Sequence, residues 1–163
     1  MTAQLNQSIA RARALSHLLD PLDVESGGLR QALSQLADRS GEAFAIGCTF
    51  EAPPALPELG GEVALNLYRI AQEAIHNAVE HGRATQVTVR AQCDDQGVTL
   101  SIVDDGCGFD AESTDTARHS GMGLRIMKYR AGALRALLEV QSAPGQGCKV
   151  TCRLPFAADL QSP

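Results

Sequence analysis

The sequence contains no tryptophan, and aromatic residues make up only 4% of the chain. Proteins that hold single-stranded nucleic acid stack its bases on aromatic side chains, so this scarcity argues against that class. Basic residues are also few: 14 lysines and arginines stand against 19 aspartates and glutamates, for a formal charge of −5. An acidic chain with a pI of about 5.3 has no overall attraction for nucleic acid, so any site for a polyanion must be local.

Long hydrophobic runs are missing as well. No apolar stretch approaches the ~20 residues that cross a bilayer. The first residues, MTAQLNQSIARAR, lack the apolar segment of a secretory signal. We therefore expect a cytoplasmic chain that makes no membrane contact of its own.

Cysteines with metal-binding spacing are absent too. The five cysteines are odd in number and include no C-x-x-C pair: Cys48, Cys93, Cys107, Cys148 and Cys152. Together with four scattered histidines they do not make a zinc site. We expect them to be small buried hydrophobic residues in a reducing compartment.

What remains is typical of one packed globular domain, with 163 residues, 44% of them hydrophobic and 20% charged. Apolar periodicity predicts helices over residues 5–19, 26–39, 62–81 and 123–136. Gly41 is expected to end the second helix. Alternating apolar residues predict strands over residues 43–51, 87–93, 98–102, 137–142 and 148–155. This order predicts an α+β fold, a two-layer sandwich with helices on one face of a mixed, mainly antiparallel sheet.

The long helix predicted over residues 62–81 carries polar side chains beside its apolar stripe. Glu73 and Asn77 lie one turn apart and share a face, near Asn66 and Glu80. A carboxylate and a carboxamide that point the same way offer two hard oxygens, the kind of ligand that Mg²⁺ takes. The alternative is a solvated helix face without a ligand.

Two glycine motifs follow this helix. In DDGCGF, after a predicted strand, Asp104 can accept a hydrogen bond from an exocyclic amine, and Gly106 and Gly108 let backbone approach a flat ligand. Gly121 and Gly123 open the next predicted helix, where free backbone N–H groups form an anion seat. Each motif alone is also compatible with an ordinary turn or hinge. Neither is a Walker or a Rossmann fingerprint.

The order of the three motifs is more specific than any one of them. QEAIHNAVEHG resembles the N box, IVDDGCGF the G1 box and GMGL the G2 box of the ATP-binding (Bergerat, or GHKL) superfamily. That superfamily contains sensor histidine kinases, gyrase-type topoisomerases, Hsp90 chaperones and MutL mismatch-repair proteins. Within it, the chain most resembles the ATPase domains of nitrate-sensor-like, NarL-partnered histidine kinases.

The resemblance implies a role for each matching residue. Glu73 matches an acidic residue that assists phosphotransfer or orders a water, and Asn77 matches the Mg²⁺ ligand. Asp104 matches the carboxylate that reads the adenine amino group of ATP. The other matches contact phosphate, shape the adenine pocket or lie beside the triphosphate: His81, Gly106, Gly108, Gly121, Met122, Gly123 and Leu124.

Three positions depart from the family pattern. Glu80 stands where many members carry lysine or arginine, which predicts repulsion of the triphosphate and weaker ATP affinity. Cys148 replaces a common threonine beside the adenine and predicts the loss of one water-mediated contact. Ala136 replaces a frequent glycine.

The resemblance also divides the chain. Residues 1–24 match the end of a dimerisation or linker helix, residues 25–157 a histidine-kinase-like ATP-binding domain and residues 158–163 a tail. No histidine matches the family's phosphoacceptor, because His17 is interpreted as structural and the others lie in the N box or the lid.

The expected function follows from this division. The chain is expected to be a catalytic domain that transfers the γ-phosphoryl of ATP, with Mg²⁺, to a histidine on a dimerisation domain outside this chain, without labelling itself. A response regulator is the expected next partner, and the parent protein is expected to be a sensor whose cytoplasmic part includes this chain.

Two alternatives stay open. One is a stand-alone regulatory protein of the same fold, such as an anti-sigma-factor serine kinase. The other, motivated by Glu80, is a non-catalytic nucleotide-binding module. A topoisomerase or a MutL-like ATPase is less favoured, because it would need a transducer domain with a catalytic lysine.

Overall fold

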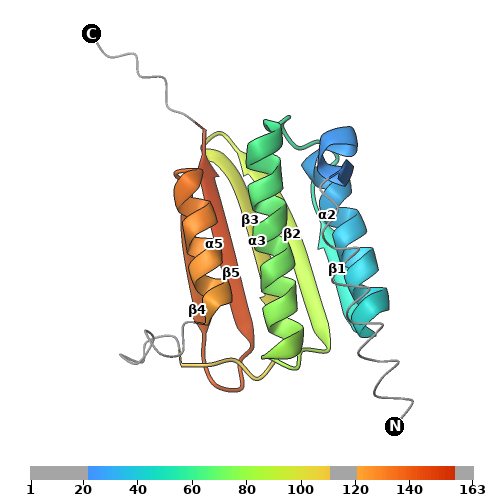
Figure 1. Cartoon of the computed structure of the whole chain (residues 1–163), viewed down its shortest axis with the longest axis vertical. Helices are drawn as coiled ribbons and strands as arrows, with labels where there is room; N and C mark the ends of the chain where they lie inside the picture. Colours follow the sequence, from blue (N-terminus) through green and yellow to red (C-terminus); the bar gives the residue numbers. More distant parts are fainter. Residues whose placement is uncertain (1–21, 111–120, 157–163) are drawn as a thin grey trace.

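The structure is a computed structural model of the chain, and it describes residues 22–110 and 121–156. This part of the chain forms three helices and five strands (Figure 1). In chain order they are α2 (Leu22–Phe44), β1 (Gly47–Glu51), α3 (Gly61–Glu80), β2 (Gln86–Asp94), β3 (Gly97–Asp104), α5 (Met122–Ala133), β4 (Leu137–Ser142) and β5 (Cys148–Pro155). The helix predicted over residues 5–19 and the tail over 158–163 lie outside the described residues.

The strands form one mixed sheet in the order β1-β2-β3-β5-β4. Only β1 and β2 run parallel, and the other three neighbouring pairs are antiparallel. All three helices lie on one face of this sheet, with α3 between α2 and α5 (Figure 1). The predicted two-layer α+β fold with a mainly antiparallel sheet is therefore confirmed.

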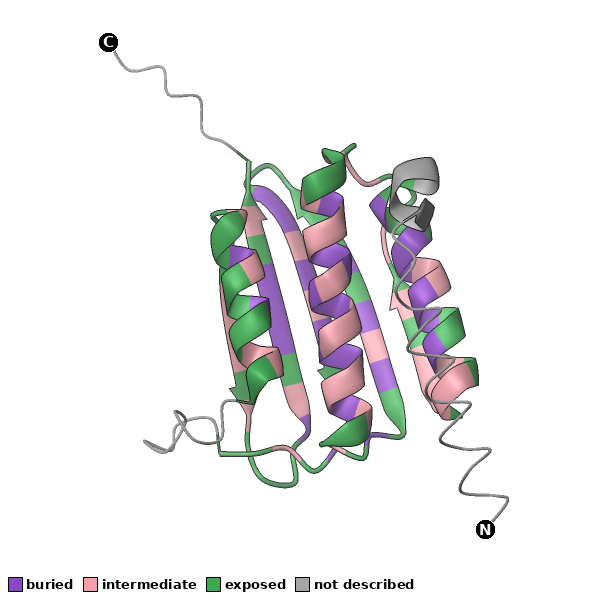
Figure 2. Cartoon of the chain, viewed as in Figure 1, coloured by how far each residue is buried: buried purple, intermediate pink, exposed green. Residues whose placement is uncertain are grey.

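The central helix α3 supplies much of the core. Its buried face repeats at helical spacing and consists of Ala64, Leu67, Tyr68, Ile70, Ala71, Ala74, Ile75 and Ala78 (Figure 2). Fully buried side chains of the size of Leu67 and Ile70 each contribute about 1.5–3 kcal/mol to folding. Apolar periodicity predicts a stripe of Val63, Leu67, Ile70, Ala71, Ala74, Ile75 and Ala78 on this helix, and all of these residues are buried except Val63, which is half-buried. Tyr68, which is not in that stripe, is buried as well.

Helix α2 differs from the prediction at both ends. It begins before residue 26, and a non-helical residue, Gly28 (φ 71°, ψ 171°), separates two helical stretches. It also continues through Gly41 to Phe44, so the prediction that Gly41 ends it, and that Phe44 belongs to the first strand, is wrong. A Cβ at Gly41 would lie 3.3 Å from the Ile46 carbonyl oxygen, so the glycine permits a close approach of the returning chain. The helix ends instead where Ala45 takes a left-handed φ of 55°.

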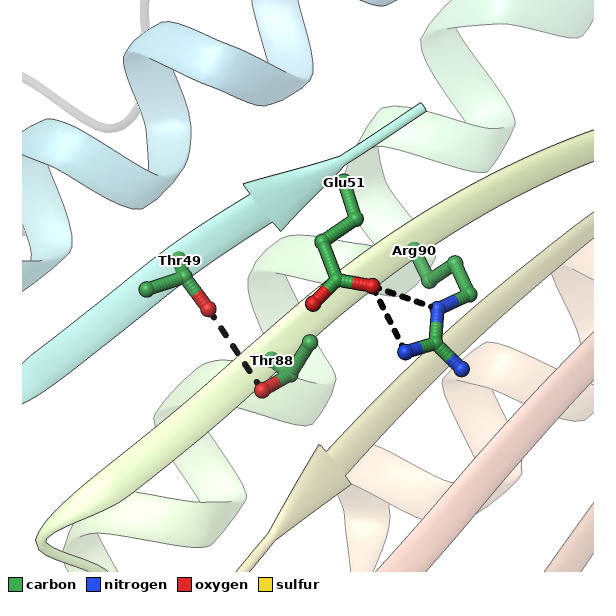
Figure 3. A network of polar contacts seen from close by, with 4 residues as sticks. All are labelled: Thr49, Glu51, Thr88 and Arg90. Atoms are coloured by element: carbon green, nitrogen blue, oxygen red, sulfur yellow. Dashed lines mark hydrogen bonds and ion pairs between the residues drawn. The ribbon is translucent and has the colours of Figure 1, made fainter. Parts of the chain in front are cut away.

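The face of the sheet that no helix covers is polar. Along β2, Val87 and Val89 are buried on the helix side, whereas Arg90 on the other side is exposed. There Arg90 pairs with Glu51 of β1, and the Thr49 and Thr88 hydroxyls lie 3.4 Å apart (Figure 3). Polar side chains on this face explain why two layers suffice: the second face of the sheet can remain in water.

The cysteines are only partly as expected. Cys152 is buried in β5, and Cys48 and Cys148 are half-buried, but Cys93 and Cys107 are exposed, which corrects the expectation of buried cysteines. None of the helices in residues 22–110 and 121–156 is both long and apolar enough to span a bilayer.

Candidate functional site

A cavity of about 690 Å³ lies where α3 and α5 meet the ends of β3 and β5. Its volume is within the range of about 300–1,000 Å³ that small-molecule sites occupy. All the residues predicted for the site line it, except Gly106: Glu73, Asn77, His81, Asp104, Gly108, Gly121, Met122, Gly123 and Leu124. Three separate sequence motifs therefore converge on one cavity.

The α3 side of the cavity is closely fitted to the start of α5. Glu73 and Asn77 are half-buried, one helical turn apart. A Cβ on Gly123 would overlap the Glu73 Oε1 and would lie 2.9 Å from the Asn77 Nδ2. The glycine is thus needed for the carboxylate and the carboxamide to lie directly against the first turn of α5.

The first turn of α5 presents its backbone to the cavity. Gly121 is the N-cap, and no side chain caps the helix there. The first N–H groups of a helix have no partner within it and carry the positive end of its dipole. Because Gly121, Met122 and Gly123 all line the cavity, this helix start can hold an anionic group.

Asp104 is the last residue of β3 and also lines the cavity. Its Oδ1 accepts a hydrogen bond from the Gly106 N–H at 2.8 Å. Burial raises the pKa of this carboxyl, and the neighbouring charge of Asp105 adds to the effect, whereas hydrogen bonds from the Gly106 and Cys148 N–H groups oppose it. A half-buried carboxylate at a cavity wall is a strong acceptor for an amine donor.

The adjacent Asp105 has a different role. It is exposed, does not line the cavity and accepts hydrogen bonds from the Thr85 and Gln86 N–H groups at 2.8 and 2.9 Å and from the Thr85 hydroxyl at 2.7 Å. These bonds lower the pKa of its carboxyl, that from Gln86 most. Asp105 therefore connects the end of β3 to the start of β2, whereas the carboxylate of Asp104 lines the cavity.

The glycines of DDGCGF allow the chain to pass between two neighbours. A Cβ on Gly106 would lie 2.6 Å from the Gly82 carbonyl oxygen at the end of α3. Gly108 takes a left-handed φ of 60°, and a Cβ there would overlap the Ala143 carbonyl oxygen. Gly106 is buried behind the cavity wall, so it shapes the site without lining it.

An apolar floor completes the cavity, and sequence reasoning did not include it in the site. Ile102, Met127 and Val150 come from β3, α5 and β5, and Ala74 and Ala78 from α3. One signal could have identified Ile102, which precedes Asp104 by two residues and so shares its face of the strand. Met127 and Val150 join the floor only through the tertiary fold.

Three further polar residues complete the description. His76 lines the cavity, and its Nδ1 is buried without a hydrogen-bond partner among the described residues. Burial and then the charge of Asp104 raise the pKa of the Cys148 thiol to about 11, so this thiol stays protonated and neutral at pH 7. Glu80 is exposed at the end of α3 and is not among the residues that line the cavity, although its neighbour His81 is.

The residues that line the cavity provide groups suited to three kinds of ligand. A carboxylate acceptor and an apolar floor suit a flat base that carries an amino group. The start of α5 suits phosphate, and the Asn77 and Glu73 oxygens beside it suit a hard cation such as Mg²⁺. Together these features are typical of a nucleotide-binding site.

Comparison with known families agrees with this class. Residues 62–158 match the family described as histidine kinase-, DNA gyrase B- and HSP90-like ATPases, and the chain belongs to that family. More particularly, it resembles the ATP-binding part of sensor histidine kinases. It is 33% identical to the sensor histidine kinase MctS of Rhizobium johnstonii over 95% of this chain and 33% of the relative.

Other relatives give the same result. The sensor histidine kinase LiaS of Bacillus subtilis is 32% identical over 88% of this chain and 39% of its own length. The nitrate/nitrite sensor protein NarX of Escherichia coli is 32% identical over 90% of this chain and 24% of its own length. The chain thus spans well under half the length of these relatives.

Solved structures share the fold. The histidine kinase domain of the Erythrobacter litoralis EL346 blue-light activated kinase superposes with a TM-score of 0.66 at 20% identity, over 96% of this chain and 82% of that one. The ATP-binding domain of PrrB from Mycobacterium tuberculosis gives 0.62 at 21% identity, over 79% and 94%.

Proposed function

We propose that the chain is the ATP-binding catalytic domain of a sensor histidine kinase, which transfers the γ-phosphoryl of ATP to a histidine on a dimerisation domain outside this chain. The observation that carries the proposal is the convergence of Asp104, the Glu73–Asn77 pair and the start of α5 on one cavity. The sensor-kinase relatives support it over a stand-alone regulatory protein of the same fold.

In the proposed binding mode the purine amine donates a hydrogen bond to Asp104, and the ring lies over Ile102, Met127 and Val150. In this orientation of the base, the ribose and phosphates extend toward α5, and the first N–H groups of α5 hold phosphate oxygens. His81, exposed at the cavity rim, is placed to donate to the same oxygens. Adenine is favoured over guanine because guanine has a carbonyl at C6, where adenine has the amine that would donate to Asp104.

Catalysis in this proposal comes from positioning and charge. Asn77 would hold Mg²⁺, which would supply charge neutralisation to the phosphates when bound. Glu73, one turn earlier, orients the incoming imidazole by accepting a hydrogen bond from its N–H, so that the other ring nitrogen can attack phosphorus. The phosphoryl group would pass to a response regulator aspartate in the next step.

Calorimetric titration of the purified chain with ADP and ATP tests the proposal. We expect binding that strengthens with Mg²⁺, no binding of GDP at the same concentrations, and no radiolabel on the chain itself after incubation with γ-labelled ATP. Failure of adenine nucleotides to bind at millimolar concentration would refute the proposed function. Label on a partner serine instead of a histidine would favour the serine-kinase alternative.

A further inference from the structure

Ser142 joins two segments of the chain that meet beside the cavity. It is the last residue of β4, it is half-buried, and it does not line the cavity itself. Its hydroxyl donates a hydrogen bond to the Gly147 carbonyl oxygen at 2.8 Å and accepts one from the Phe109 N–H at 2.9 Å. A serine hydroxyl has a single proton to donate, and Gly147 receives it.

The peptide group that Ser142 holds is the one that reaches Asp104. The Gly147 carbonyl and the Cys148 N–H belong to the same planar peptide unit. The Cys148 N–H donates a hydrogen bond to the Asp104 carboxylate, and strand pairing places Cys148 opposite both Ser142 of β4 and Asp104 of β3. A continuous series of hydrogen bonds therefore runs from the Ser142 hydroxyl through this peptide to Asp104. In such a series each bond polarises the next, so a donor on the carbonyl makes the N–H a stronger donor in turn.

Gly147 permits this close approach. It takes a left-handed φ of 70°, and a Cβ there would overlap the Asp104 carbonyl oxygen. Two residues earlier, the Gly145 N–H donates to the Cys107 carbonyl oxygen at 2.6 Å. The turn between β4 and β5 therefore packs directly on the DDGCGF loop, and the side chain of Ser142 hydrogen-bonds to both.

The bond to Phe109 distinguishes this arrangement from an ordinary turn. A bond from Ser142 to Gly147, five residues later, is local and would also be expected in a turn that only joins two strands. Phe109, however, comes 33 residues earlier in the chain and lines the cavity. The thiol of Cys148, which also lines the cavity, is hydrogen-bonded to the Ser142 side chain as well. One hydroxyl outside the cavity thus contacts three residues of its wall, two of them directly and Asp104 through one peptide.

We propose that Ser142 is a positioning residue of the nucleotide site, whose hydroxyl aligns the Cys148 N–H on the Asp104 carboxylate and holds Phe109 at the cavity wall. This role rests on the proposed function, in which Asp104 accepts the purine amine. Without the hydroxyl, the Cys148 N–H would be a weaker donor, and a carboxylate that burial already disfavours would lose stabilisation. Asp104 would then take up a proton at higher pH and become a poorer acceptor for the amine.

Several titratable side chains lie around Asp104. They come from its own loop, from β5 and from α3: Asp105, Asp110, Cys148, Glu73, His76 and His81. The neighbouring β2 contributes the uncharged Val87, and the described residues of α5 that line the cavity carry no charge. Replacement of Ser142 by alanine leaves all of these groups in place. The histidines and the phosphates of ADP titrate in both proteins, so a difference between the two pH profiles reports on Asp104.

Two measurements compare Ser142→Ala with the wild type. Carbon-13 NMR of the nucleotide-free protein follows the Asp104 carboxyl, and its titration midpoint should move up by about half a pH unit or more in the variant. Calorimetry at pH 7 should show an ADP affinity that is about fivefold lower, and the loss of affinity on acidification should begin at a higher pH. Ser142→Thr keeps the hydroxyl and should restore both values to those of the wild type.

A double-variant cycle separates positioning of Asp104 from general support of the fold. In the Asp104→Asn background the series of hydrogen bonds no longer ends on a charge, so adding Ser142→Ala should lower ADP affinity by less than about twofold. Ser101→Ala, at a half-buried position of β3, is the matched control and should change neither measurement.

Three results would overturn the inference and leave nucleotide binding intact. They are an Asp104 titration that does not move in Ser142→Ala, an equal loss of ADP affinity in both backgrounds, and behaviour of Ser142→Thr that matches Ser142→Ala. Failure of the wild type to bind ADP would instead refute the proposed function.

Discussion

At the scale of single residues, the two neighbouring aspartates at the end of β3 have different roles. The Asp105 carboxylate accepts hydrogen bonds from the backbone N–H groups of Thr85 and Gln86, whereas Asp104 lines the cavity. The DDGCGF motif predicted from the sequence contains both aspartates. Only the alternation of side chains along β3, which places Asp104 on the same face as Ile102, favours Asp104 as the residue of the site. Asp104 is paired with Val87 of β2 on one side and with Cys148 of β5 on the other. Strand pairing on both sides therefore fixes the backbone position of the carboxylate that lines the cavity.

Replacing Asp104 by asparagine should weaken adenine nucleotide binding. A hydrogen bond to a charged acceptor contributes about 1.5–3 kcal/mol, so we expect the ADP dissociation constant to rise by about tenfold or more in calorimetry. The exposed turn variant Asp95→Asn is the control and should bind normally. Equal affinity in the two variants would contradict the role given to Asp104.

The raised pKa of Asp104 adds a pH dependence with a definite sign. Burial disfavours the charged form in the folded state, so this carboxyl destabilises the nucleotide-free protein; the cost is fully present above its folded pKa, decreases as pH falls below that pKa, and is gone below the unfolded value of 3.8. Nucleotide affinity should run the opposite way and decline on acidification through the same pKa. At pH 7, Asp104→Asn should therefore have a higher melting temperature than the wild type when both lack nucleotide, as differential scanning calorimetry can show.

The two glycines at the start of α5 form a natural pair of tests. A methyl group at Gly123 would displace the ends of Glu73 and Asn77, whereas at Gly121 nothing lies within 4 Å of the added atom. We expect Gly123→Ala to weaken binding of Mg²⁺-ADP at least tenfold and Gly121→Ala to change it less than twofold. The reverse order of effects would refute the close packing of α3 on α5.

At the scale of whole elements, the sequence predicted most of α3, α5 and the antiparallel strands because their patterns are local. It failed where packing decides, as at Gly41, through which α2 continues despite the cost of about 1 kcal/mol for a glycine within a helix and where the glycine lets the Ile46 carbonyl oxygen approach closely. The apolar floor of Met127 and Val150 was missed for the same reason, since no local spacing links α5 to β5. The three motifs were found because each carries its own polar signature.

Helix α2 contains a buried hydroxyl without a partner. Ser40 is 1% exposed, and its Oγ makes no hydrogen bond among the described residues. Such a group costs about 1–3 kcal/mol, so Ser40→Ala should raise the free energy of unfolding by about 1 kcal/mol or more in urea titration. Ser34→Ala, a half-buried position of the same helix, controls for helix propensity and should give a smaller gain.

The connection between β3 and β2 should be sensitive to acid. Hydrogen bonds lower the pKa of Asp105 in the folded state, so its contribution to stability is fully present above the unfolded value of 3.8 and is lost as pH falls through the folded pKa. Asp105→Asn should reduce stability at pH 7, and the gap to the wild type should close in strong acid. A gap that is the same at both pH values in chemical denaturation would contradict this account.

At the scale of the whole molecule, the two faces of the sheet have separate tasks. The helix side holds the core and the cavity, and the open side holds exposed polar groups such as the Glu51–Arg90 pair. An exposed ion pair contributes about 1 kcal/mol or less. Glu51→Ala/Arg90→Ala should therefore lower stability by no more than about 1 kcal/mol, with a smaller effect in high salt, and should leave ADP affinity unchanged in calorimetry. A loss of nucleotide binding in this variant would show that the two faces are coupled.

The left-handed backbone at Gly28 has a mechanical consequence. A continuous helix would couple the turns before Gly28 rigidly to the rest of the domain. The non-helical Gly28 instead interrupts α2 between its two stretches. A Cβ added at Gly28 would meet no described atom within 4 Å. The two helical stretches of α2 on either side of Gly28 therefore need not share one axis.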